Sequence, residues 1–221
     1  MTLNKRTVYL VLAFTMAAAL YGAAADDTRA RIGNAVKVLN DLTESPGHGI
    51  WPEQIAKADC AVIIPGFKKG AAGVGVGFGR GFISCRNGDN WSAPGAVTLQ
   101  TTSLGTQLGG ERIDIVVLSL DKDLRPKLLS DRLTIGSDVS AAWGNGKSAA
   151  SNPDVKVLFF AQTKGIFAGF SLDGANLKPD DSSNRALYGK SIGNAAIVGG
   201  QVATPAVAQP LVATLKEKSS H

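Results

Sequence analysis

Glycine occupies every second position in one stretch of this 221-residue chain, and this alternation most constrains how the chain can fold. Between residues 73 and 82 the glycines alternate with Val74, Val76, Phe78, Arg80 and Phe82. Successive side chains of a strand point to opposite faces, so this period predicts a β-strand with one bare face and one mostly apolar face. A bare strand face admits a packed helix, a bend or a ligand, and we expect packing or curvature. Arg80 lies on the apolar face, where a charge needs a partner or a ligand.

The composition is that of a folded domain with a mild positive charge. Hydrophobic residues make up 44% of the chain and charged residues 19%, which provides enough apolar material for a core and excludes global disorder. The net charge of +5 is too small to indicate nucleic-acid binding by itself. At roughly 100–200 residues per domain, the length predicts a single domain.

The first 25 residues have the pattern of a secretory signal peptide. Lys5 and Arg6 precede an apolar run over residues 8–20, and three alanines at 23–25 then precede two aspartates. The run is shorter than the roughly 20 residues that a membrane-spanning helix needs. We therefore predict that the chain is cleaved after Ala25 and exported. The mature protein is expected to be periplasmic or secreted, either free or attached to the surface of a membrane. An uncleaved anchor is the alternative.

The two cysteines, Cys60 and Cys85, both lie in apolar, strand-like sequence. Adjacent strands could bring them together, and an exported protein is exposed to oxidising conditions that favour disulfides. We therefore predict a Cys60–Cys85 disulfide. The alternative is a pair of buried free thiols that pack as small hydrophobic side chains.

Residues 28–43 have the spacing of an amphipathic helix. Its apolar face holds Ile32, Ala35, Val36, Leu39 and Leu42. Its opposite face holds Arg31, Asn34, Lys37 and Asp41. Such a helix either docks on a core or lies on a membrane surface, and the docked arrangement is the prediction.

Most of the remaining chain has the pattern of strands. Strands are predicted at 60–64, where Pro65 ends the run, and at 70–81, 96–104, 112–120, 133–143, 155–162 and 166–172. Helical segments are predicted at 52–58, 124–129 and partly 184–198, with a last helix after Thr204 and fraying over 216–221. Strands and long helices do not alternate. We therefore predict an α+β fold, a single domain with a curved, mainly antiparallel, half-barrel-like sheet packed with N- and C-terminal helices.

The motifs of common enzymes each fail by one residue. A phosphate-binding loop requires G-x-x-x-x-G-K-[ST], but the two Gly-Lys-Ser triplets have Ala141 and Asn184 where the first glycine belongs. The G-x-S-x-G nucleophile motif is broken by Asp173. Of the two histidines, only His48 is a plausible catalytic base. We therefore predict no enzymatic activity, no metal site and no cofactor.

A series of short blocks resembles, in order, the SYLF domain, also called the Ysc84-type domain. The blocks are Ile63-Ile64-Pro65, Lys68-Lys69-Gly70, Gly79-Arg80-Gly81, Trp91-Ser92-Ala93-Pro94, Gly105-x-Gln107-x-Gly109, residues 114–117, 134–140 and 164–174, Asn184 and Tyr188-Gly189. The resemblance covers about residues 32 to 200. It implies a SYLF domain over 26–200 after the signal peptide at 1–25, followed by a C-terminal helix and tail over 201–221.

The resemblance implies non-catalytic binding of phospholipids. Eukaryotic proteins that resemble this chain bind phosphoinositides, and some bind actin filaments through accompanying regions. The chain is identified as an exported bacterial-type member, and export disfavours actin as a partner. We expect it to bind an anionic phospholipid membrane surface, and the candidate lipid-binding residues are Lys68, Lys69, Arg80 and Lys164. The alternative is a structural or protein-interaction module of the cell envelope without lipid specificity.

Overall fold

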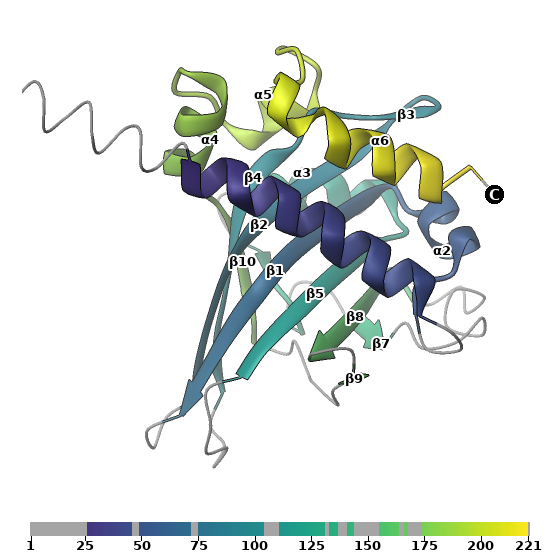
Figure 1. The fold of residues 1–221 in the computed structure, drawn as a ribbon, viewed down its shortest axis with the longest axis vertical. Coiled ribbons are helices and arrows are strands. Elements are labelled where there is room, and N and C mark those ends of the chain that lie inside the picture. The colour runs from purple at the N-terminus through teal and green to yellow at the C-terminus, as the bar shows by residue number, and fades with distance from the viewer. Residues whose placement is uncertain are drawn as a thin grey trace, which may run out of the picture.

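The computed structural model describes residues 26–45, 49–71, 75–103, 111–130, 133–136, 141–143, 155–163, 166–167 and 174–220. In this part of the chain, one curved sheet carries helices from both ends of the chain across one of its faces (Figure 1). The predicted signal peptide, His48 and Lys164 lie outside the described residues. Among the helices that are described, none is both long enough and apolar enough to cross a membrane.

The sheet contains ten strands among the described residues. They are β1 (Cys60–Ala71), β2 (Gly75–Asn87), β3 (Asn90–Trp91), β4 (Gly95–Ser103), β5 (Glu111–Ser119), β6 (Leu133–Thr134), β7 (Ala141–Trp143), β8 (Val157–Thr163), β9 (Ile166–Phe167) and β10 (Asn176–Pro179). Eight follow the order β6-β10-β4-β2-β1-β5-β8-β7, while β3 pairs with β2 and β9 with β8. The described pairs are antiparallel, except that β7 runs parallel to β8. The predicted α+β class with a curled, half-barrel sheet is confirmed.

The helices flank this sheet. The N-terminal helix covers residues 26–44. The other helical segments are α2 (Pro52–Lys57), η1 (Lys122–Leu124), α3 (Arg125–Leu128), α4 (Asp181–Tyr188), α5 (Asn194–Val198), η3 (Ala206–Ala208) and α6 (Gln209–Lys218). The N-terminal helix and α6 lie side by side (Figure 1), and Lys218 Nζ lies 3.3 Å from Glu44 Oε1. The prediction that the chain frays from residue 216 is therefore wrong as far as Lys218.

The sheet buries apolar side chains on both faces. On the helix face, Ile63 and Phe82 belong to one cluster with Leu39 of the N-terminal helix and residues of α6. On the inner face, Ile64 and Ile83 belong to a second cluster, to which η1 and α3 also contribute. Neighbouring residues of one strand therefore serve different cores, as the alternation of a strand requires.

The N-terminal helix is docked on the sheet, as predicted. Ile32, Leu39 and Leu42 are at most 2% exposed, so the apolar stripe of this helix is not available to a membrane surface. Arg31, which the periodicity places on the outer face, is instead buried. The reason is that its guanidinium donates a hydrogen bond to Ser183 Oγ at 3.0 Å.

The bare glycine face of β2 is filled by close packing, as predicted. A Cβ on Gly77 would lie 2.4 Å from the Phe67 ring, and one on Gly81 would lie 1.9 Å from the Ile63 carbonyl oxygen. A Cβ on Gly79 would also collide with side chains of the inner face. The odd positions of β2 therefore face inward, and the even positions face the helix side of the sheet.

The prediction that Pro65 ends the first strand is wrong, because β1 continues beyond it as part of a β-bulge. The register of β1 against β2 shifts between Ile63 and Lys68. Gly66 has a φ of 61° and donates its N–H to Asp114 Oδ1 at 2.7 Å. A bulge takes the proline, which has no N–H to donate, out of the regular ladder.

One other strand prediction needs correction, and the strand β10 was not predicted at all. The single strand predicted at 133–143 is two short strands, β6 and β7, at opposite edges of the sheet. β10 was not predicted, because Leu177 is its one fully buried residue and it has no long apolar run. Its place in the sheet comes from its pairing with β4 and β6.

Candidate functional site

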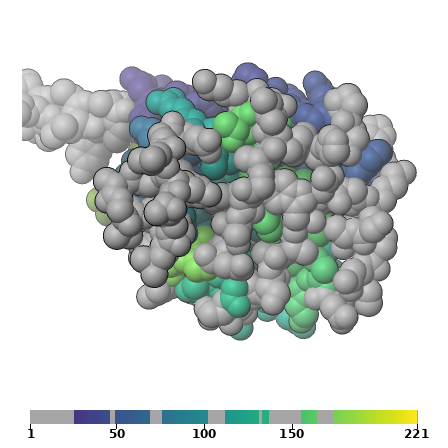
Figure 2. Space-filling view, turned by 90° about the horizontal axis from the view of Figure 1, so that it is seen from below, coloured from purple at the N-terminus to yellow at the C-terminus, as the bar shows by residue number. Residues whose placement is uncertain are grey.

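The far ends of β1, β2 and β5 extend beyond the helix layer (Figure 1). The strand register places a group of their side chains on the helix face of the sheet. Lys68 of β1 is the backbone partner of Phe78 in β2 and of Arg112 in β5. Directly opposed residues of antiparallel strands share a face, and Val76 and Arg80 share it because they lie two residues from Phe78. We call Lys68, Val76, Phe78, Arg80 and Arg112 the distal face. Figure 2 shows the molecule from this end, with the purple N-terminal helix along one edge.

Two large apolar side chains are exposed on the distal face. Phe78 is 43% exposed and Val76 is 55% exposed, and no other large hydrophobic residue of the described part is comparably exposed. Single exposed apolar residues are ordinary, whereas a contiguous exposed group marks a contact surface. Phe82, further along the same face of β2, is fully buried in the helix-side core. The exposure therefore begins where the helix layer ends.

Arg80 has a carboxylate partner and is also exposed to solvent. Its Nε lies 3.4 Å from Asp180 Oδ2, and its guanidinium carbon lies 5.8 Å from the centre of the Phe78 ring. The Arg80 side chain is nevertheless 42% exposed, whereas the Asp180 side chain is buried. Arg80, which the glycine alternation places on an apolar face, thus has a carboxylate partner and still reaches solvent.

Asp180 is the N-cap of α4, and groups of that helix donate hydrogen bonds to its carboxylate. The carboxylate accepts hydrogen bonds from Ser182 Oγ at 2.6 Å, from the Ser183 N–H at 3.1 Å and from Ser183 Oγ at 2.8 Å. Burial favours the neutral acid, but the hydrogen bonds and the charge of Arg80 outweigh it and hold the pKa of Asp180 below its usual value. Arg80 can therefore move away without leaving this carboxylate unpartnered.

A pocket of about 490 Å³ adjoins the distal face at Arg112. It lies between the N-terminal helix and the β1 bulge, and it is also lined by Arg31, Lys37, Gly66 and Asp114. Two of its cations pair with carboxylates one helical turn away, Arg31 with Asp27 and Lys37 with Asp41. The third cation of the pocket, the exposed Arg112, also belongs to the distal face, so we assign the solvent-facing positive charge of this end to that face. The described residues contain no group of three or more His, Cys, Asp or Glu that could hold a metal ion.

The structure brings two of the four candidate lipid-binding residues together. Lys68 and Arg80 share the distal face. Lys69 follows Lys68 in β1, where its backbone pairs with Gly77, and its side chain lies outside the described part of the structure. Lys164 lies outside the described residues altogether.

Three members of the distal face, Val76, Phe78 and Arg112, were not among the predicted site residues. Arg112 could not be placed beside Lys68, because the register of β5 on β1 is set by tertiary packing and has no local signature. The signal for Phe78 was present in the glycine alternation, which predicted a large side chain on the face opposite the glycines. It was not recognised as exposed because the helix layer could not be traced from sequence.

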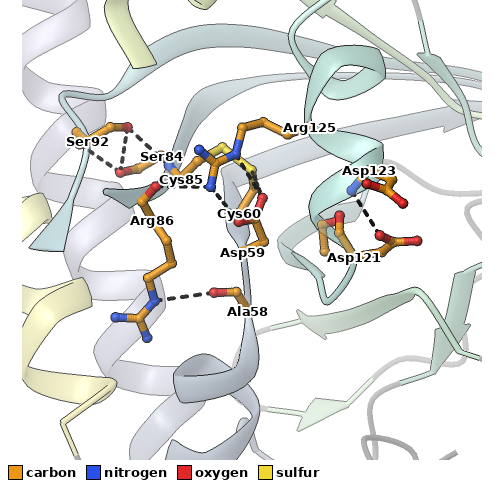
Figure 3. A network of polar contacts seen from close by, with 11 residues as sticks. Ala58, Asp59, Cys60, Ser84, Cys85, Arg86, Ser92, Asp121, Asp123 and Arg125 are labelled. Carbon is orange, nitrogen blue, oxygen red and sulfur yellow. Dashed lines mark hydrogen bonds and ion pairs between the residues drawn. A yellow bond between two sulfur atoms is a disulfide. The ribbon is translucent and has the colours of Figure 1, made fainter. Parts of the chain in front are cut away.

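The predicted disulfide fixes β1 to β2 at the end of the strands opposite the distal face (Figure 3). Cys60 and Cys85 are backbone partners and are bonded to each other. Beside them, Arg125 donates hydrogen bonds to Asp59 Oδ2 at 2.9 Å and to the Arg86 carbonyl at 3.0 Å. This end thus combines a covalent bond with a partly buried ion pair, which favours a rigid anchor for both strands.

The polar residues of the SYLF-like blocks hold α4 and α5 on β4. Asn184 Oδ1 accepts the Ala96 N–H at 2.7 Å, and its Nδ2 donates to Asn194 Oδ1 at 2.7 Å. Tyr188 donates its hydroxyl to the Pro94 carbonyl at 2.7 Å, and burial raises the pKa of this tyrosine. Asn184 and Tyr188 therefore serve the fold, and they act on the distal face by positioning α4 with its cap residue.

The fold and the site together define a half-barrel domain with a basic and apolar face at one end of its sheet. A family model, Ysc84, described as "Las17-binding protein actin regulator", matches residues 100–218. The chain therefore belongs to the Ysc84 family, whose shared unit is the SYLF domain.

Curated proteins of this family are similar to the chain over most of its length. An SH3 domain-containing protein of Schizosaccharomyces pombe is 33% identical over 178 residues, covering 76% of this chain and 41% of that protein. Protein YSC84 of Saccharomyces cerevisiae is 32% identical over 206 residues, covering 84% and 42%. SH3 domain-containing YSC84-like protein 1 of Homo sapiens is 30% identical over 189 residues, covering 80% and 55%. The chain thus spans about half the length of the curated relatives it matches, and no solved structure matches it.

Proposed function

We propose that this SYLF domain binds the surface of anionic phospholipid membranes through its distal face, without catalysis. The observation that carries the proposal is the grouping of Lys68, Arg80 and Arg112 around the exposed Phe78. Three cations on one side of a sheet present a surface complementary to lipid phosphates, and the apolar side chains between them suit the interfacial region of a bilayer.

The expected strength of membrane binding depends on the local group of cations and not on the net charge of the chain. Each Lys or Arg near an anionic bilayer contributes roughly 1 kcal/mol, and the contribution falls off within a Debye length. Three converging cations would therefore supply about 3 kcal/mol at moderate salt. Binding driven in this way is expected to weaken as salt is added.

Vesicle co-sedimentation tests the proposal. The purified protein should pellet with vesicles that contain phosphatidylserine or phosphoinositide and not with neutral phosphatidylcholine vesicles. Lys68→Glu combined with Arg112→Glu should abolish the difference between the two lipids. The matched control is Lys122→Glu combined with Lys127→Glu, which reverses two exposed charges near the disulfide end of the sheet and should leave binding unchanged. Equal losses in both double variants, or no lipid preference in the wild type, would refute the proposal.

We further propose that the protein is exported as a bacterial-type member of the family and meets its membrane outside the cytoplasm. The support is the basic, apolar and alanine-rich pattern of residues 1–25. Mass spectrometry of the protein recovered from cells that express the whole chain should find Asp26 as the first residue. An N-terminus at Met1 would contradict cleavage.

A second candidate function is binding of a protein partner, and the family description favours it. That description names Las17 binding and actin regulation. Co-sedimentation with actin filaments, using the same two double variants, would test this function. Filament binding that is lost with the distal-face variant, in a protein that shows no lipid preference, would favour the second candidate over the first.

A further inference from the structure

We propose that Phe78 and Val76 insert into the hydrocarbon boundary of the bilayer, so that the domain recognises an assembled membrane and not a soluble headgroup. This inference rests on the proposed function and names the physical form of its ligand. Its starting observation is that the two exposed large hydrophobic residues of the described chain are neighbours on one face of β2.

The fold forces these two side chains outward. The inner side of β2 is occupied at Gly77 and Gly79, where an added Cβ would lie 2.4 Å from the Phe67 ring and 2.5 Å from Ile64 Cγ2. A shift of β2 by one residue would place both Phe78 and Phe82 on this filled side, and it would remove the fully buried Phe82 from the helix-side core. The side chains at 76 and 78 therefore have no inward alternative, and their exposure is a property of the register.

The surrounding charges identify the occupant as an anionic bilayer. Lys68 lies directly across from Phe78, and Arg80 extends beside the Phe78 ring, with 5.8 Å between the guanidinium carbon and the ring centre. Long cationic side chains keep their charged ends in the polar layer while their stems lie along apolar material. An aromatic ring between such cations has the arrangement of an interfacial anchor, with the ring below the phosphates and the charges level with them. A purely apolar protein groove would offer no anionic group to either of these cations.

The experiment uses protein purified after expression of the whole 221-residue chain. Phe78→Ser combined with Val76→Ser should weaken binding to phosphatidylserine vesicles by roughly ten- to a hundredfold, because burial of these side chains is lost. Thr98→Ala is the control, since Thr98 lies on the same face as the backbone partner of Arg80 but is not apolar. Both variants should keep the melting temperature of the wild type, because exposed side chains contribute little to folding.

A second measurement reports how deeply the side chain at position 78 enters the bilayer. Tryptophan emission of Phe78→Trp, measured as the difference from the wild type with its three tryptophans, should shift to the blue on binding and be quenched by lipids brominated on their acyl chains. Soluble glycerophosphoserine should compete poorly. Unchanged vesicle binding in the double serine variant, absence of acyl-chain quenching, or full competition by the soluble headgroup would each overturn the inference while leaving the proposed function intact.

Two other outcomes are also decisive. If the wild-type protein binds no vesicles, the proposed function and this inference fail together. If sedimentation velocity shows a dimer that Phe78→Ser converts to a monomer, with vesicle binding unaltered, the exposed pair is a contact between two copies of the chain. That result would overturn membrane insertion.

Discussion

Arg80 and its carboxylate partner determine how freely the distal face can bind an anion. Asp180→Asn keeps an acceptor for the first turn of α4, since asparagine is a good N-cap, but it removes the charge that holds Arg80 at 3.4 Å. We expect this variant to bind anionic vesicles severalfold more tightly than the wild type in co-sedimentation at fixed salt. Asp181→Asn is the control, because it removes the same charge from an exposed neighbour. Equal gains in the two variants would show that net charge, and not release of Arg80, is the cause.

Asp114 provides a second test at the scale of a single residue, through the pH dependence of folding stability. Burial raises the pKa of its carboxyl group, so the folded protein holds this proton more tightly than the unfolded chain does. Stability contributed by the proton is present at low pH and is lost as the pH rises through the raised pKa. Asp114→Asn keeps an acceptor for the Gly66 N–H and removes the buried charge. We therefore expect a higher melting temperature than that of the wild type at about pH 7, and no difference at about pH 3.

Lys37 and Asp41 of the N-terminal helix also act on the Asp114 carboxyl, the first favouring its charged form and the second opposing it. The melting experiment should therefore be repeated in high salt, which screens these two exposed groups more strongly than it changes burial. A gain in Asp114→Asn that is equal at both pH values would contradict the assignment to the carboxyl proton.

Among the elements, β1 and β2 depend on the disulfide at one end and on packing at the other. The Cys60–Cys85 bond closes a loop with a sequence separation of 25, which restricts the unfolded chain. Cys60→Ala combined with Cys85→Ala should lower the free energy of unfolding by about 2–4 kcal/mol, measured by denaturant unfolding. Wild-type protein in reducing agent should show a similar loss. An unfolding curve that is unchanged on reduction would contradict the prediction.

The elements also show which parts of the fold have a local signature. The N-terminal helix and the glycine strand were predictable because each repeats a burial pattern along its own sequence. Pro65 was misjudged because a bulge, with Gly66 at positive φ, lets β1 continue past a residue that normally ends a strand. β10 was missed because its stability comes from neighbouring strands and not from its own four residues.

For the whole molecule, the class of fold and the disulfide followed from the sequence, but three of the five residues of the distal face did not. Lys68 and Arg80 carried a signal because each belongs to a short block that contains glycine. Arg112 is 44 positions from Lys68 in the sequence and reaches it only through the pairing of β5 with β1. The boundary between buried Phe82 and exposed Phe78 depends on where the helix layer stops, which is a property of the assembled domain.

The alternation in β2 also determines which positions of such a domain can be substituted without loss of the fold. Its positions 77, 79 and 81 are restricted to glycine by contacts on the inner face, whereas the even positions 76, 78 and 80 touch little of the core. The requirements of folding and of binding therefore fall on interleaved residues of a single strand and do not compete. Three substitutions at these even positions would be enough to adapt the same half-barrel to surfaces of different charge or polarity.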